Sequence, residues 1–166
     1  MADSPLILIM MGSDSDLPVM REAVDILVKF GVPHEIRISS AHRSPLRTMA
    51  LASEAAGRGI RIIIAGAGMA AHLAGVVAAK TTLPVIGVPM PGGALNGVDA
   101  LYSTVQMPGG IPVATMAIGK AGAKNAGIFA VQILALGDAR LGEALSAYRR
   151  EMDQDVAQKD AALQNM

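Results

Sequence analysis

The chain has 166 residues, no cysteine and a formal net charge of zero. This length suits one domain with a core of its own, and the lack of cysteine excludes disulfides and thiolate catalysis. The neutral charge gives no sign of binding to nucleic acid or to a membrane surface. We therefore expect one domain over residues 1–166 in a reducing cytoplasm, without a secretory signal in residues 1–5.

Short apolar runs alternate with amphipathic segments along the chain. The expected strands are residues 6–11, 35–39, 60–65, 85–88 and 113–118. The expected helices are residues 16–30, 44–57, a short Ala-rich segment after the third strand, 98–106 and a buried helix at 125–136. Prolines and glycines at 106–112 predict a stiff structural turn.

The composition changes at residue 138. Before it lies the expected core, about residues 5–136, and after it Leu141, Leu145, Tyr148, Met152 and Val156 recur every three or four residues among charges. This spacing predicts an amphipathic C-terminal helix at about 138–160, with fraying of the last residues.

The composition is also unusually apolar. Hydrophobic residues make up 52% and charged residues 17%, against roughly 45–50% and 25% in typical domains. A small domain does not need so many apolar residues for its own core. We expect some of them to be buried between copies of the chain in a homo-oligomer.

Alternating strands and helices predict a parallel sheet covered by helices on both faces. Ligands of such folds bind at the carboxyl ends of the strands, so the loops at 12–16, 40–44 and 66–72 are the candidate site. The uncharged stretch at 62–79 is long enough for a membrane span. Its glycines, His72 and isoleucine run favour a strand, a loop and a short helix instead.

The first motif runs from Gly12 to Asp16 and has the sequence GSDSD. A glycine, serine hydroxyls at Ser13 and Ser15, and the following helix start predict a phosphate cradle, with Asp16 on ribose hydroxyls. The alternative is an ordinary helix start capped by Ser15 or Asp16. A divalent-metal site on Asp14 and Asp16 would need further acidic ligands. No other acidic residue lies near the remaining strand ends, so we expect no metal.

The second motif, Ser40-Ala41-His42-Arg43, lies between a strand end and a helix start. An imidazole can give and take a proton near neutral pH, and a guanidinium binds phosphate through its planar fork. The alternative is a histidine that caps a turn beside an exposed arginine. The position at a strand's carboxyl end favours a functional role.

The third motif, residues 66–72, has the sequence GAGMAAH and formally matches the dinucleotide-binding fingerprint. That fingerprint requires an acidic residue about 20 positions later, and residues 85–91 contain none. We therefore expect no dinucleotide cofactor. Small residues at Gly68 and Ala70 leave room for a flat ring and a small apolar gas molecule. His72 is either a polar group of the site or an ordinary helix histidine.

Together these segments resemble the bacterial 5-(carboxyamino)imidazole ribonucleotide mutase family. The matching segments are MGSDSD at 11–16, SAHR at 40–43, IAGAGMAAHLAG at 64–75, ALNGVDALYSTVQMPGGIPVAT at 94–115 and AIGKAGAKNAG at 117–127. The resemblance covers residues 6–136 and leaves out the C-terminal helix.

The resemblance implies a flavodoxin-like three-layer α/β/α sandwich with a central parallel sheet, an extra C-terminal helix and assembly as a homo-octamer. It implies no metal, no nucleotide cofactor and no biotin. His42 matches the family's general acid–base, and Arg43 its phosphate-binding arginine. The positions that match the substrate-binding loops are Gly12, Ser13, Ser15, Asp16, Ser40, Ala41, Gly68, Ala70 and His72.

The implied reaction belongs to purine biosynthesis and has a ribonucleotide and CO2 in one pocket. A carbamate on the exocyclic amine loses CO2, which then attaches to ring carbon four while His42 takes the proton from that carbon. Because CO2 is held beside the ring, proximity takes the place of chemical activation. Two alternatives stay open, a direct aminoimidazole ribonucleotide carboxylase and a nucleotide-binding module without catalysis.

The chain departs from the family at a few positions. Many members have glycine in place of Met69, proline in place of Ala74, and a Ser-x-Ala-Leu loop in place of residues 92–95. A sister branch that carboxylates directly has lysine after the histidine, whereas this chain has Arg43. The sequence therefore favours the mutase.

Overall fold

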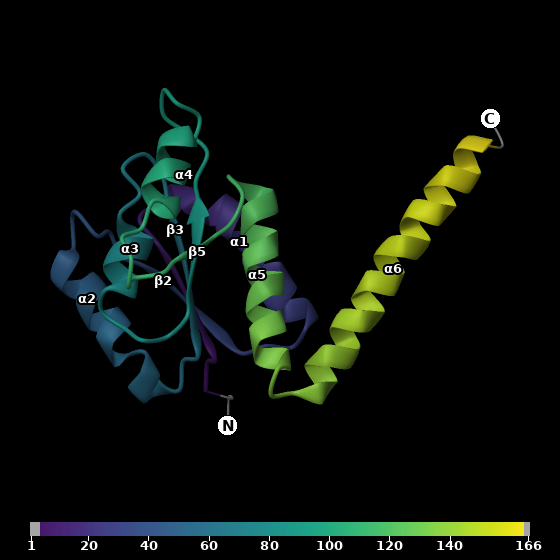
Figure 1. Ribbon diagram of the computed structural model, residues 1–166, viewed down its shortest axis with the longest axis horizontal. Coiled ribbons are helices and arrows are strands. Elements are labelled where there is room, and N and C mark those ends of the chain that lie inside the picture. Colours follow the sequence, from purple (N-terminus) through teal and green to yellow (C-terminus); the bar gives the residue numbers. More distant parts are fainter. Residues whose placement is uncertain (1–3, 165–166) are drawn as a thin grey trace. The chain divides into compact units, whose positions relative to one another are not determined.

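The computed structural model describes residues 4–164 (Figure 1). Its strands are β1 (Ile7–Met11), β2 (His34–Ile38), β3 (Ile62–Ala67), β4 (Val85–Pro89) and β5 (Ala114–Thr115). Its α-helices are α1 (Leu17–Lys29), α2 (Pro45–Glu54), α3 (Leu73–Ala78), α4 (Val98–Val105), α5 (Lys120–Ala135) and α6 (Ala139–Gln164). Two short 3₁₀ helices, η1 (Asp14–Asp16) and η2 (Ala56–Arg58), precede α1 and follow α2.

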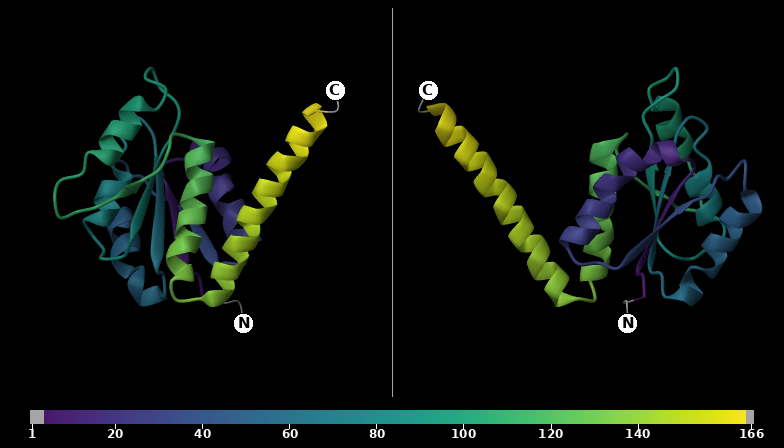
Figure 2. Two further views of the ribbon diagram at one scale, coloured as in Figure 1. Left: turned by 45° about the vertical axis from the view of Figure 1, so that its right-hand side comes forward. Right: turned by 180° about the vertical axis from the view of Figure 1, so that it is seen from behind.

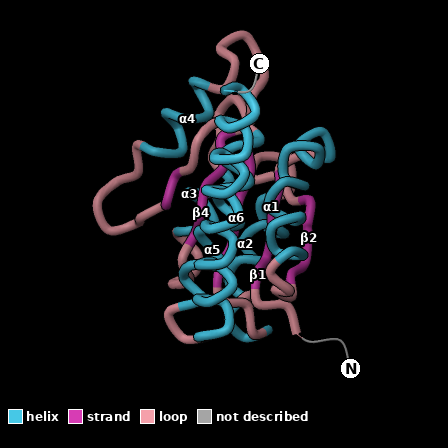
Figure 3. Tube along the Cα trace, turned by 90° about the vertical axis from the view of Figure 1, so that its right-hand side faces the viewer, coloured by secondary structure: helices cyan, strands magenta, loops and turns pink. Residues whose placement is uncertain are grey.

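The five strands form one parallel sheet in the order β2-β1-β3-β4-β5, with β2 at one edge (Figure 3). β1 and β4 are buried along their whole length, and β3 is buried except at Ala67, as continuous apolar runs in parallel sheets usually are. The order 2-1-3-4-5 is that of flavodoxin-like folds. The expected parallel sheet and flavodoxin-like sandwich are thus confirmed.

Helices cover both faces of the sheet. α1 and α5 lie on one face, and α2 and α3 lie on the other (Figures 1 and 2). α5 approaches α1 closely at Gly127, where an added Cβ would lie 3.0 Å from both the Ala23 carbonyl oxygen and the Ile26 side chain. Under α2 and α3, alternate residues of the strands such as Leu8, Met10 and Ile63 pack against the helices in one buried cluster.

The strand order changes direction between β1 and β3. From β1 the chain crosses to β2 on one side, and from β3 it continues toward β4 and β5 on the other. Two hydrogen bonds tie the carboxyl ends together: the Gly12 N–H donates to the Gly66 carbonyl at 3.3 Å, and the Ser39 N–H donates to the Met11 carbonyl at 2.9 Å. Such a switch point is where open α/β sheets bind ligands.

Two expected boundaries in the last third of the fold are wrong. The strand expected at 113–118 pairs with β4 only over Ala114–Thr115. Beyond it the chain turns at Gly119, whose φ is +78°, and α5 starts at Lys120 rather than at residue 125. The apolar pattern of the sequence does not predict this first turn of α5, because the turn contains the exposed Lys120 and Lys124.

Two further expectations need correction. β3 starts two residues later than expected, because the Ile60 N–H closes the turn after α2 by donating to the Ala55 carbonyl. The helix expected to be buried at 125–136 is buried on one face, at Ala126 and Ala130. Ile133 and Leu134 are half-buried, and Leu136 is 90% exposed.

The described chain forms two compact units, one up to Ala130 and the other from Val131 onward. The second unit contains α6, which is helical through Gln164, four residues beyond the expected end. Of its expected apolar stripe, Leu141 and Tyr148 are buried, whereas Met152 and Val156 are exposed. The expected fraying concerns 165–166, which lie outside the described residues. Within residues 4–164, no helix has the length and hydropathy that a membrane crossing requires.

Candidate active site

The loop after β1 is held by a capping box. The Ser15 N–H donates to the Ser13 hydroxyl at 3.3 Å, and the Ser13 N–H donates to the Asp16 carboxylate at 3.1 Å. Asp16 stands at the N-cap position of α1, but its carboxylate turns back to Ser13 instead of capping that helix. The Ser13 and Ser15 amides are therefore paired within the loop, and the phosphate cradle expected at this helix start stays a prediction. The Ser13 hydroxyl donates to the Asp14 carboxylate at 3.0 Å, and the Ser15 hydroxyl donates to the Ser13 hydroxyl at 2.9 Å. Each hydroxyl has to rotate away from this partner before it can donate to a ligand.

The loop after β2 is a closed turn. The Ser40 N–H donates to the Ser44 hydroxyl at 3.0 Å, and the Arg43 N–H donates to the Ser40 hydroxyl at 3.1 Å. Ser44 stands at the N-cap position of α2, but its hydroxyl donates to the Ser40 carbonyl and makes no capping bond. This turn leaves His42 and Arg43 exposed, and the Arg43 guanidinium donates to the Gly12 carbonyl at 3.1 Å.

The loop after β3 brings the second histidine to the first. His42 Nε2 and His72 Nδ1 lie 2.7 Å apart, and the rings meet edge to face at 82°. In such a bond one nitrogen carries the proton and the other accepts it. Which of the two nitrogens donates depends on the tautomers of the rings. Of the two readings of His72, the structure favours a polar group of the site.

One pocket of about 460 Å³ contains every predicted site residue. It lies at the carboxyl ends of β1, β2 and β3, as the fold class predicts. Its lining consists of Gly12, Ser13, Ser15, Asp16, Ser40, Ala41, His42, Arg43, Ala67, Gly68, Met69, Ala70, His72 and Leu73. Sequence reasoning missed three of these, Ala67, Met69 and Leu73. Ala67 and Met69 lie within the third motif and Leu73 directly follows it, so the motif itself was the available signal.

A second cavity of about 510 Å³ continues from the first and shares Gly12, Ser13, Ser40 and Arg43 with it. It adds Arg47, so two guanidinium groups line this end of the site. Sequence reasoning missed Arg47, although its place in the first turn of α2, close behind the second motif, could have indicated it. Two arginines and several hydroxyls make this cavity suited to a phosphate.

Asp16 has a pKa above its ordinary value. Burial is the largest cause, because a half-buried carboxylate loses hydration, and the charge of Asp14 adds to it. The N–H groups of Ser13 and Gly12 and the charge of Arg43 oppose the shift only in part. The folded chain therefore holds the Asp16 proton more tightly than the unfolded chain does. This contribution to stability is full below the ordinary carboxyl pKa and is lost as the pH rises through the raised value.

An Asp16→Asn variant is accordingly expected to be at least as stable as the natural chain at pH 7, because it removes an ionised group that the fold disfavours. The amide oxygen can still accept from the Ser13 N–H. The melting temperature of the variant relative to the natural chain should rise between pH 4 and pH 7. A variant that melts well below the natural chain at pH 7 would contradict this account.

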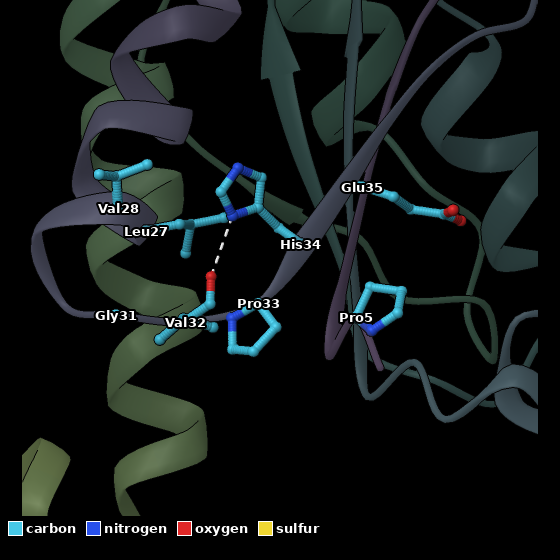
Figure 4. Close-up of a pocket in the computed structure, with 8 residues that line it drawn as sticks. All are labelled: Pro5, Leu27, Val28, Gly31, Val32, Pro33, His34 and Glu35. Carbon is cyan, nitrogen blue, oxygen red and sulfur yellow. Dashed lines mark hydrogen bonds between the residues drawn. The ribbon is translucent and has the colours of Figure 1, made fainter. Parts of the chain in front are cut away.

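A third pocket lies at the opposite, amino end of β2 (Figure 4). It has about 610 Å³ and is lined by apolar residues together with His34 and Glu35. The His34 Nδ1–H donates to the Val32 carbonyl at 2.9 Å, and Glu35 pairs with Arg58 at 2.6 Å. No predicted site residue lines it, and it lies away from the strand ends where this fold class binds ligands.

Within residues 4–164, no three His, Asp or Glu side chains gather as ligands for a metal ion. The Asp14 carboxylate accepts from the Ser13 hydroxyl and the Ser15 N–H. The alternative of a metal on Asp14 and Asp16 thus lacks a third ligand from the described chain.

Comparison with known proteins identifies the family of the chain. The family model described as AIR carboxylase matches residues 6–155. The chain belongs to the AIR carboxylase family. That match includes all three loops of the pocket and extends through α5 into α6.

Relatives within the AIR carboxylase family carry two different names. The N5-carboxyaminoimidazole ribonucleotide mutase of Synechocystis is 57% identical over 98% of this chain and 92% of its own length. The phosphoribosylaminoimidazole carboxylase of Schizosaccharomyces pombe is 52% identical over 99% of this chain, which covers 29% of that longer protein. A crystal structure of Treponema denticola PurE superposes with a TM-score of 0.86, at 30% identity, over 96% of this chain and 98% of that one.

Proposed function

We propose that this AIR carboxylase family member converts N5-carboxyaminoimidazole ribonucleotide to its isomer carboxylated at ring carbon four, a step of purine biosynthesis. The observation that carries the proposal is the 57% identity, over nearly the full length of both chains, to a mutase with this substrate in its name. The bonded histidine pair in a pocket at the strand ends supports it, since the reaction requires proton transfer.

The chemistry of the pocket suggests how the substrate binds. We assign the phosphate to the end with Arg43 and Arg47, where two guanidinium groups offer donors. The ribose hydroxyls fit Asp16 and the serine hydroxyls of the β1 loop. The imidazole then lies at the other end, between the histidine pair and the small residues Gly68 and Ala70.

The proposed reaction balances with His42 as the only proton carrier. The carbamate carbon–nitrogen bond breaks, CO2 leaves, and protonated His42 gives its proton to the exocyclic nitrogen. Ring carbon four then bonds to CO2 and loses its proton to the now neutral His42, which restores the aromatic ring and the starting state of the enzyme. His72 is the polar partner of His42 through both steps. Holding CO2 beside the ring removes the entropic cost of a second encounter.

An Arg43→Ala variant is expected to raise KM roughly ten- to hundredfold, because it removes charge-assisted hydrogen bonds worth about 1.5–3 kcal/mol. The kcat should change little if the phosphate is bound equally in the ground and transition states. Steady-state kinetics measure both values. Arg61→Ala is the matched control, since it removes the same charge at the amino end of β3. An unchanged KM in the Arg43 variant would contradict the phosphate role.

The direct test is conversion of N5-carboxyaminoimidazole ribonucleotide by purified protein without ATP or added metal. The substrate carries an isotope label in its carbamate carbon. Formation of the labelled carbon-four carboxylate faster than the label equilibrates with dissolved bicarbonate supports the mutase. Carboxylation of aminoimidazole ribonucleotide under CO2 without that conversion supports the direct carboxylase, the reaction in the name of the Schizosaccharomyces pombe relative. Binding without either reaction leaves a nucleotide-binding module.

We further propose that the chain acts as a homo-oligomer, most simply the octamer that the family resemblance implies. Exposed apolar side chains on α4 and in the loop before it support an interface: Leu95, Val98, Tyr102 and Val105. Light scattering after gel filtration measures the subunit number. We also propose a cytoplasmic location, because the phosphorylated substrate does not cross hydrocarbon without a transporter.

A further inference from the structure

The candidate pocket has two chemically different ends. One end carries the arginines, the serine hydroxyls and Asp16. The other end, beside the histidine pair, is walled by Ala67, Gly68, Met69, Ala70 and Leu73. Leu73 is buried, whereas Met69 is 63% exposed. Met69 is therefore the long apolar side chain of this wall that is free to cover a bound molecule.

The backbone holds Met69 in a conformation that suits glycine better. Its φ is +51°, in the left-handed region, and among residues 4–164 Asn96 is the other residue besides glycine with positive φ. Asparagine tolerates the left-handed region, whereas methionine is disfavoured there. Ser103 on α4 fixes the next part of the loop by accepting the Ala71 N–H at 3.1 Å. A strained residue in a ligand pocket points to a role for its side chain.

The loop after β4 leaves room for the Met69 side chain. A Cβ added at Gly93 would lie 3.3 Å from Met69 Cγ and 3.7 Å from its sulfur. Gly92 and Gly93 both have positive φ, so this loop approaches Met69 with bare backbone. The thioether thus reaches from the pocket wall to the loop after β4.

We infer that Met69 determines how well the enzyme retains CO2 between the two halves of the reaction, an inference that rests on the proposed function. When the carbamate bond breaks, the carboxyl group becomes a small uncharged molecule that arginine and serine side chains no longer hold. Only apolar contact and closure keep such a molecule beside the ring. A methionine side chain is flexible and polarisable enough to cover it closely.

The test follows the carbamate carbon of the substrate into the product. Substrate labelled with ¹³C in the carbamate is converted by excess enzyme in a single turnover, in unlabelled bicarbonate with carbonic anhydrase, and the label in the product is measured by mass spectrometry. The natural chain should keep most of the label. Met69→Gly should lose it several times more often, and Met69→Leu, with a similar apolar side chain, should keep it. A control without enzyme corrects for spontaneous decarboxylation of the substrate.

Met69→Gly is expected to fold, because glycine relieves the left-handed strain. If it does not, Met69→Gln, with similar length but a polar end, compared with Met69→Leu decides the same question. Equal label retention in all folded variants overturns the inference and leaves the proposed function standing. If the natural chain converts no substrate, the proposed function fails, and the inference fails with it.

Discussion

A His42→Asn variant is expected to lose about 10²–10⁴-fold in turnover while it keeps its fold and its affinity for the ribonucleotide. His42 is exposed and its ring bonds to His72, so its loss removes no buried packing. Asparagine keeps a polar side chain but cannot carry the proton between nitrogen and carbon. The measurement is kcat for conversion of N5-carboxyaminoimidazole ribonucleotide, with substrate affinity from equilibrium binding.

His34→Asn is the matched control for this prediction. His34 lines the pocket at the amino end of β2, and its ring donates to the Val32 carbonyl, a bond that an asparagine amide can also make. The control should retain full activity. Full activity in the His42 variant would refute the acid–base assignment, and equal losses in both variants would indicate a general effect on the fold.

A Gly122→Ala variant is expected to be destabilised by at least about 3 kcal/mol or to fail to fold, beyond the usual cost of overpacking. Gly122 lies in the first turn of α5, and a Cβ there would lie 1.6 Å from the carbonyl oxygen of Ala117. The obstacle is backbone, which cannot rotate away as a side chain can. Chemical denaturation of the natural chain and the variant measures the difference.

Gly142→Ala, in α6, is the matched control, and we expect the opposite change in stability. Apart from the neighbouring backbone of α6 itself, no described atom lies within 4 Å of a Cβ added at Gly142. Alanine is favoured over glycine in helices by roughly 0.5–1 kcal/mol, so this variant should be slightly more stable than the natural chain. If both variants changed stability alike, the close approach of α5 to Ala117 would be refuted.

The sequence predicted most of the sheet, and the reason is physical. Buried parallel strands appear as continuous apolar runs, and β1 and β4 are such runs bounded by proline or glycine. β5 was overestimated because pairing at a sheet edge depends on the neighbouring strand, and Gly119 turns the chain away. The sequence did not predict the first turn of α5, because Gly122 disfavours a helix and the polar Lys120 and Lys124 interrupt the apolar pattern.

The sequence predicted which three loops form the site but not how their side chains contact one another. Fold class alone brings the carboxyl ends of β1, β2 and β3 together, so the three motifs meet in one pocket. The bond between His42 and His72 depends on side-chain geometry across two loops, which spacing along the chain does not reveal. The capping box of the first loop, in contrast, follows from the spacing of Ser13 and Asp16, which is typical of that motif.

The position of β1 between β2 and β3 also sets the order in which activity can appear during refolding. β1, α1 and β2 are neighbours in sequence and can assemble early, which brings the Ser13 and His42 loops side by side. His72 joins them only after Ile7 meets Ile62, a pairing that must first close a long loop. We therefore expect the phosphate end of the site to form before its second histidine joins it. Recovery of catalysis should lag behind recovery of helical structure.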